Sequence, residues 1–140
     1  MSVPRRARRT IRHIVFYGTL RAGHKEHSRL KLRMALAYVG KCQLDGKLYD
    51  LGRYPGLVLG AGQAEGEVYR IRDHALLARL DAFEGFDARK PARSRFVRKV
   101  IAVRRPPNST VRIPAWIYVF NGALNGRREV QGGAWPRGHR

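Results

Sequence analysis

Residues 14–20 read Ile14-Val15-Phe16-Tyr17-Gly18-Thr19-Leu20, an apolar run that ends at a glycine. This pattern predicts a short strand followed at once by a tight turn. Because glycine has no Cβ, backbone amides in such a turn can approach a ligand closely and hold a carboxylate or a developing oxyanion. Taken alone, the segment fits two interpretations: an ordinary structural turn, or an anion-binding turn at the end of a strand.

The rest of the chain contains mostly strand-like segments. The predicted strands cover residues 13–18, 37–49, 57–59, 66–71, 95–104 and 111–120. Asp45-Gly46 is a strong hairpin signal, and alternation places Val68 and Tyr69 on opposite faces of their strand. Many strands beside little helix predict an α+β fold with an antiparallel, barrel-like sheet.

One good helix is predicted over residues 74–84, with Asp73 as its N-cap and Gly85 at its end. A shorter helical patch lies near residues 30–35. At about 100° per residue, one arc of the longer helix faces the core. The apolar members of this arc are Leu76, Leu77, Leu80 and Phe83. The predicted helix therefore packs on the sheet through one face.

Glu84 falls inside this core-facing arc, and Asp81 lies on its border. Burial and the negative end of the helix dipole both favour a protonated carboxyl, so we expect a raised pKa for Glu84. A glutamate with such a pKa is a usable general acid or base near neutral pH. The alternative is that Glu84 turns to solvent or pairs with Arg98. Asp81 is expected to be structural, and Glu67 an ordinary solvent-facing residue.

Length and composition predict one domain with a basic segment at each end. The 140-residue chain is long enough for a packed core, and Cys42 has no partner for an internal disulfide. We divide it into a flexible basic arm (1–12), a domain (13–121) and a basic tail rich in glycine and arginine (122–140). No stretch has the length of a membrane span. The cytoplasm is the expected location, although the arginine-rich arm would also suit an organellar transit segment.

The formal net charge is +19, from 29 Lys and Arg against 10 Asp and Glu. The two ends account for less than half of this charge, so the body is basic as well. A field of this sign attracts RNA and other polyanions. The alternative explanation is a compositional bias toward arginine. Nucleic-acid or ribonucleoprotein binding, through the basic ends and an arginine-rich surface, is thus a second hypothesis for function.

Six segments of the chain, taken in order, resemble the gamma-glutamylcyclotransferase-like superfamily, in its gamma-glutamylamine cyclotransferase branch. The matching segments are residues 15–23, 46–52, 54–58, 66–71, 80–85 and 116–121. They include the Tyr17-Gly18-Thr19-Leu20 turn and Leu80-Asp81-Ala82-Phe83-Glu84-Gly85. The resemblance spans about residues 13–121 and therefore the whole predicted domain.

The resemblance implies a small mixed, mostly antiparallel β-barrel flanked by helices, with a pocket at its mouth. It implies that Tyr17, Gly18, Thr19 and Leu20 bind a γ-glutamyl group and that Glu84 is the catalytic acid/base. The implied reaction is an intramolecular cyclisation, of acyltransferase or lyase type, that yields 5-oxoproline and a released amine or peptide. No metal or organic cofactor is implied, and the histidines show no metal-ligand spacing.

Two departures from the family pattern bear on the site. Where the family often has Tyr-x-Arg, this chain has Phe96-Val97-Arg98, so any role of a tyrosine hydroxyl there is lost. Residues 89–93 add positive charge near the expected pocket. That charge would either lower the pKa of Glu84, against the burial argument, or favour an anionic substrate.

Overall fold

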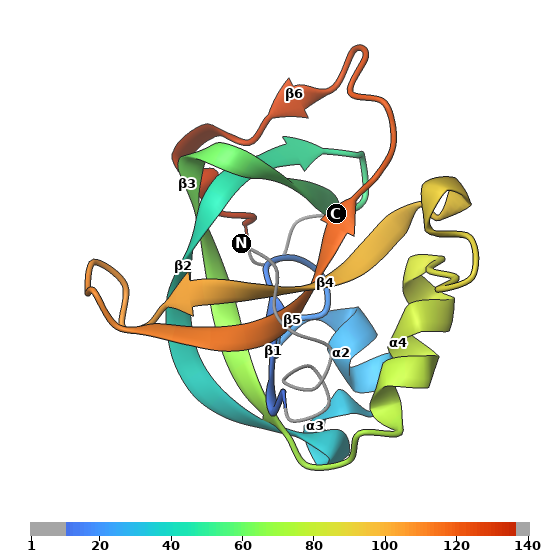
Figure 1. Ribbon diagram of the computed structural model, residues 1–140, viewed down its shortest axis with the longest axis vertical. Coiled ribbons are helices and arrows are strands. Elements are labelled where there is room, and N and C mark those ends of the chain that lie inside the picture. The colour runs from blue at the N-terminus through green and yellow to red at the C-terminus, as the bar shows by residue number, and fades with distance from the viewer. Residues whose placement is uncertain (1–10, 137–140) are drawn as a thin grey trace.

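Five strands close into a barrel in the computed structural model, which describes residues 11–136 (Figure 1). The strands are β1 (His13–Phe16), β2 (Leu36–Asp50), β3 (Pro55–Ile71), β4 (Phe96–Arg104) and β5 (Arg112–Phe120). They run in the order β3-β1-β5-β4-β2, and pairing of β2 with β3 closes the ring. Only the β1–β5 pair is parallel among these five described strands. The predicted α+β fold with a mixed, mostly antiparallel barrel is confirmed.

Alternation along the strands divides the core into two clusters. Val15 and Ile117 point to the barrel interior, where they pack with Cys42. Ile14 and Tyr69 point to the outside, where the helices cover them. The prediction that Val68 and Tyr69 lie on opposite faces is confirmed, because they belong to different clusters.

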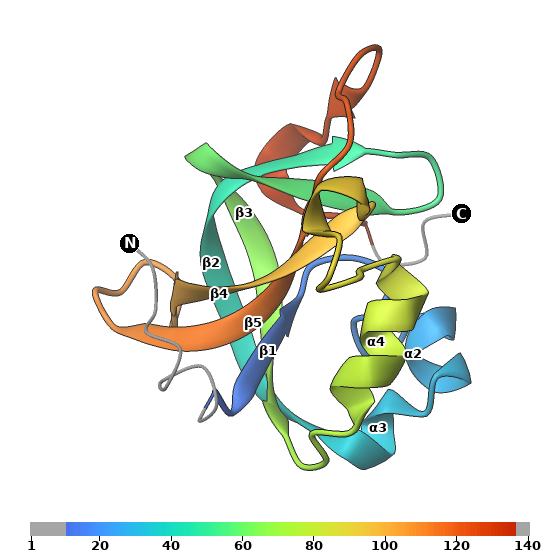
Figure 2. The same ribbon diagram turned by 45° about the vertical axis from the view of Figure 1, so that its right-hand side comes forward.

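The α-helices gather on one side of the barrel (Figures 1 and 2). They are α2 (Lys25–Arg29), α3 (Leu32–Ala35) and α4 (Leu76–Glu84), and short 3-10 turns lie at η1 (Pro91–Arg93) and η2 (Gln131–Gly133). Gly85 ends α4 in the left-handed conformation, with φ 70°, as predicted. The helix begins later than predicted, with Leu76 as its first residue. Asp73 lies before the helix, where its side chain accepts a hydrogen bond from Ala75 N at 3.0 Å.

The predicted hairpin at Asp45-Gly46 is wrong. Both residues lie inside the continuous strand β2, and the chain turns instead at residues 51–54, where Leu51 N donates to Tyr54 O at 3.0 Å. The irregularity is in β3, because Asp45 lies opposite Gln63 whereas Gly46 lies opposite Leu59. Residues 60–62 therefore form a bulge, and the two strands predicted at 57–59 and 66–71 are parts of one strand.

The segment predicted as the start of a basic tail packs on the barrel. β6 (Arg128–Glu129) pairs with β2, and Val130 N donates to Leu48 O at 2.8 Å. Trp135 is 2% exposed and belongs to the inner core cluster. At the other end Ile11 is also buried. The packed body is therefore longer than the predicted domain, because distant residues bury these apolar side chains.

Residues 1–10 and 137–140, which hold most of the predicted arm and the end of the predicted tail, lie outside the described residues. Polyanion binding through them stays a prediction. Within residues 11–136, no helix has the length and apolar character needed to cross a membrane.

Candidate active site

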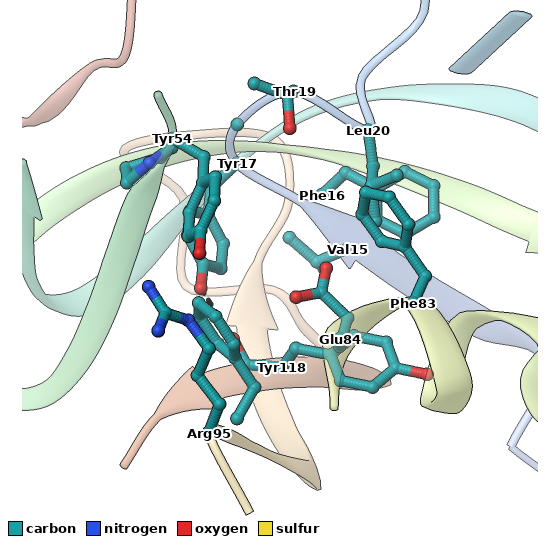
Figure 3. A pocket seen from close by; sticks show the side chains of 13 residues that line it. Val15, Phe16, Tyr17, Thr19, Leu20, Tyr54, Phe83, Glu84, Arg95 and Tyr118 are labelled. Atoms are coloured by element: carbon teal, nitrogen blue, oxygen red, sulfur yellow. Dashed lines mark hydrogen bonds between the residues drawn. The ribbon is translucent and has the colours of Figure 1, made fainter. Parts of the chain in front are cut away.

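A cavity of about 210 Å³ opens where the end of β1, the end of α4 and the start of β4 meet (Figure 3). Its walls are formed by residues 15–20, 54–55, 83–84, 95–96 and Tyr118. The structure thus brings the strand and turn at residues 15–20 together with Glu84, as the resemblance implies. All four residues of the predicted binding turn, Tyr17 to Leu20, line this cavity.

Gly18 is required in the turn by close packing. A Cβ at this position would lie 2.7 Å from the ring carbons of Pro55, and the proline ring has little freedom to move. The carbonyl oxygen of Gly18 accepts hydrogen bonds from Arg21 N at 3.1 Å and from Arg21 Nε at 2.9 Å. Arg21 is buried and also donates from Nη2 to Trp135 O at 2.6 Å. The C-terminal segment therefore fixes the turn through Arg21.

The turn leaves backbone donors available. No acceptor within residues 11–136 takes a hydrogen bond from the amides of Gly18, Thr19 or Leu20. Consecutive amides of this kind form an anion-binding concavity when a ligand supplies the acceptor. Gly18 therefore has the packing role of a structural turn, and anion binding by the neighbouring amides stays a prediction.

Tyr17 connects the turn to the barrel. Its hydroxyl donates to Tyr118 O at 2.7 Å and accepts from Leu57 N at 3.1 Å. Burial, and then the nearby charge of Glu84, raise the pKa of Tyr17, so the phenol stays protonated. The ring of Tyr17 lines the cavity, while its hydroxyl is held inside the protein.

Glu84 is the last residue of α4, and its carboxyl group points into the cavity in Figure 3. Burial raises the pKa of Glu84 to about 7, and the positive charge of Arg95 opposes this shift. Within the described part of the chain, no donor or cation forms a hydrogen bond or ion pair with this carboxyl group. The expected pKa direction is confirmed, and Glu84 is able to exchange protons near neutral pH.

Arg98, which the alternative interpretation paired with Glu84, forms its ion pair with Asp81. Arg98 donates to the two carboxylate oxygens of Asp81, from Nε at 2.8 Å and from Nη2 at 3.1 Å. The hydroxyl of Tyr118 donates to Asp81 Oδ1 at 2.7 Å, and the guanidinium of Arg98 lies over the Trp116 ring at 4.3 Å. Asp81 is therefore structural, as expected, and this cluster joins α4 to β4 and β5.

Phe83 departs from the helical-wheel prediction. Leu76 and Leu80 are fully buried, whereas Phe83 is 39% exposed at the edge of the cavity, with the guanidinium of Arg29 5.6 Å from its ring centroid. The final turn of α4 thus lies at the cavity, which Phe83 and Glu84 both line.

Comparisons with known proteins show which family this chain belongs to. The family model described as gamma-glutamyl cyclotransferase, AIG2-like, matches residues 14–137. The chain belongs to this family. The match runs past residue 121 and includes the packed C-terminal segment, which the predicted domain left out.

Three relatives and one solved structure illustrate the similarity to gamma-glutamyl cyclotransferases. The gamma-glutamylcyclotransferase family protein YtfP of Escherichia coli K12 is 36% identical over 87% of this chain and 94% of its own. The solution structure of E. coli ytfP has a TM-score of 0.62, with 34% identity, and covers 88% of this chain and 95% of its own. A putative gamma-glutamylcyclotransferase of Vibrio cholerae is 33% identical over 89% of this chain and 96% of its own. The gamma-L-glutamyl-butirosin B gamma-glutamyl cyclotransferase of Niallia circulans is 30% identical over 84% of this chain and 72% of its own.

Sequence analysis missed Arg95 in the cavity wall and misplaced Glu67. Arg95, rather than the exposed residues 89–93, is the cation that opposes the raised pKa of Glu84. Glu67 was expected in solvent but is buried, and it accepts a hydrogen bond from the Tyr69 hydroxyl at 2.7 Å. Strand alternation could have predicted that Glu67 is buried, because it lies on the same strand face as Tyr69 and Ile71. Arg95 carried no comparable signal.

Cys42 is fully buried in the barrel. Burial raises the pKa of its thiol to about 12, so it is a poor nucleophile at neutral pH. Cys42 is therefore not a candidate nucleophile, and Glu84 stays the candidate for proton transfer.

The titration of Glu84 predicts how stability depends on pH. Its pKa is 4.5 when unfolded and about 7 when folded, so the folded state binds more protons between these values. The free energy of unfolding contributed by Glu84 is thus fully present below pH 4.5 and falls as pH rises through 7, by at most about 3 kcal/mol. Urea unfolding of wild type and Glu84→Gln at pH 5 and pH 8 measures this difference.

We expect Glu84→Gln to gain stability relative to wild type on going from pH 5 to pH 8, because glutamine does not ionise. The comparison cancels the other titrating groups, which both proteins share. A difference that does not change with pH would contradict the raised pKa.

Proposed function

We propose that this protein cyclises a γ-glutamyl amine or peptide to 5-oxoproline and releases the amine or peptide, with Glu84 as general acid/base. The observation that carries the proposal is the Glu84 carboxyl group in the same cavity as the turn at residues 17–20. The names of two relatives support it: a putative gamma-glutamylcyclotransferase of V. cholerae and the gamma-L-glutamyl-butirosin B gamma-glutamyl cyclotransferase of N. circulans.

The chemistry balances within the substrate. The α-amine attacks the γ-carbonyl carbon, a new C–N bond closes the five-membered ring, and the original amide C–N bond breaks. Glu84 takes a proton from the attacking nitrogen and gives one to the leaving nitrogen. No water is consumed, so each turnover yields one 5-oxoproline and one amine or peptide.

The cavity assists ring closure by orienting the substrate. The amides of residues 18–20 hold the α-carboxylate of the glutamyl group, which fixes the carbon that bears the attacking amine. A chain held in this way loses its rotational freedom before reaction, and such orientation is a large part of the advantage of an intramolecular reaction. Tyr17 and Phe96 supply apolar walls that limit access of water.

Incubation of the purified wild type with a panel of γ-glutamyl amines and γ-glutamyl dipeptides tests the proposal. We expect at least one substrate to give 5-oxoproline and free amine in equal amounts, measured by mass spectrometry. Release of glutamate in place of 5-oxoproline would indicate hydrolysis and contradict cyclisation. A folded wild type that turns over no member of the panel would also contradict it.

A further inference from the structure

Arg95 is the positively charged side chain in the wall of the cavity. Its backbone is fixed on both sides: Arg95 N donates to Gly85 O at 3.2 Å, and Arg95 O accepts from Asn121 N at 2.9 Å. Its guanidinium lies over the ring of Tyr54, 5.4 Å from the centroid. Backbone bonds and an aromatic surface therefore hold this cation at one place on an exposed edge of the cavity.

The guanidinium of Arg95 has no carboxylate of its own. Throughout residues 11–136, no ion pair or side-chain hydrogen bond engages it. The other charged residue that lines the cavity is Glu84, and Asp81 is already paired with Arg98. A guanidinium presents a planar fork of donors that suits a carboxylate, and charge-assisted hydrogen bonds of this kind are strong.

The arrangement of charge indicates which substrate carboxylate reaches Arg95. In the proposed reaction the glutamyl α-carboxylate lies against the amides of residues 18–20, and the α-ammonium lies beside Glu84. Arg95 would repel that ammonium. Figure 3 shows the Arg95 guanidinium beside Tyr54, away from the Glu84 carboxyl group. The leaving group is therefore the part of the substrate that can contact Arg95.

We propose that Arg95 binds a carboxylate on the leaving group, so that γ-glutamyl amino acids and peptides are preferred over γ-glutamyl derivatives of neutral or cationic amines. This inference rests on the proposed cyclisation and narrows its substrate class. Arg95 acts in it as a specificity-determining residue and transfers no proton.

A pair of substrates that differ only in this charge tests the inference. They are γ-glutamyl-alanine, which has a carboxylate on the leaving group, and γ-glutamyl-alaninamide, which has a neutral amide there. We expect wild-type kcat/KM to favour the carboxylate substrate by about tenfold or more, as a charge-assisted hydrogen bond predicts. Because Arg95 also lowers the pKa of Glu84, wild type and variant are compared well above pH 7, where Glu84 is ionised in both. There Arg95→Gln should lower kcat/KM for γ-glutamyl-alanine by the same factor and leave the value for the amide within about twofold.

Arg79→Gln is the matched control, because it removes an equal charge from an exposed position of α4 outside the cavity wall. It should leave both kcat/KM values unchanged, which separates a local contact from an effect of net charge. Equal wild-type turnover of both substrates, or an equal loss for both in Arg95→Gln, would overturn the inference while the cyclisation stands. Turnover of neither substrate by folded wild type would reject the cyclisation and, with it, the role of Arg95.

Discussion

Replacement of Glu84 with glutamine is expected to lower kcat by about 10²–10⁴-fold, the usual contribution of a positioned general acid/base. Glutamine has nearly the same shape but cannot exchange a proton at neutral pH. Among the described residues, Glu84 is the one carboxylate that lines the cavity, so no second carboxylate there can transfer the proton in its place. Since the turn at residues 17–20 is untouched, KM should change little.

The rate of 5-oxoproline release by wild type and Glu84→Gln at saturating substrate measures this effect. Loss of fold would not account for a lower rate, because the glutamine variant is expected to be at least as stable as wild type near pH 8. Glu65→Gln is the control: it removes a carboxylate from an exposed site that pairs with Lys41 at 3.4 Å. A Glu84→Gln variant that keeps more than half of the wild-type kcat would reject Glu84 as the acid/base.

Trp135→Ala is expected to lower the free energy of unfolding by about 3–5 kcal/mol, the usual cost of truncating a large buried aromatic residue. Trp135 is 2% exposed and packs in the inner cluster of the barrel. Its carbonyl oxygen accepts from Arg21, which holds the carbonyl of Gly18. Loosening of residues 131–136 should therefore also disturb the turn at residues 17–20, which we propose binds the substrate, and raise KM.

Urea unfolding of Trp135→Ala and Met34→Ala separates a core contribution from a general effect of truncation. Met34 is 80% exposed, so its replacement should change the free energy of unfolding by less than about 0.5 kcal/mol. If Trp135→Ala costs less than about 1 kcal/mol, the C-terminal segment is not a stabilising part of the fold.

Most of the fold could be predicted from the sequence because the patterns that indicate its strands and helix are local. Alternation in β4 and β5 and the glycine that ends α4 depend on neighbouring residues, and each lies within a residue or two of its predicted place. The failure at Asp45-Gly46 is also local in origin, because a strong turn dipeptide was accommodated within a strand by a bulge in its partner. The packing of Trp135 was missed because its burial depends on strands far away in the sequence.

The candidate site was only partly predictable for the same reason. The helical wheel placed Glu84 on the inner face of α4, and the resemblance supplied its partner turn. The wheel could not show that α4 ends at a cavity, where Phe83 is partly exposed and Glu84 lines the wall. Arg95 reaches this cavity only because Gly85 and Asn121 fix the chain there, contacts that no sequence pattern encodes.

The pH dependence of kcat/KM for 5-oxoproline release by wild type tests the central claim most directly. Glu84 must be deprotonated to accept the proton, and burial raises its pKa to about 7. We therefore expect kcat/KM to increase with pH and to level off above an acid limb centred near 7. An acid limb near 4.5, the ordinary value for glutamate, or no release of 5-oxoproline by the folded protein at any pH, would contradict the claim.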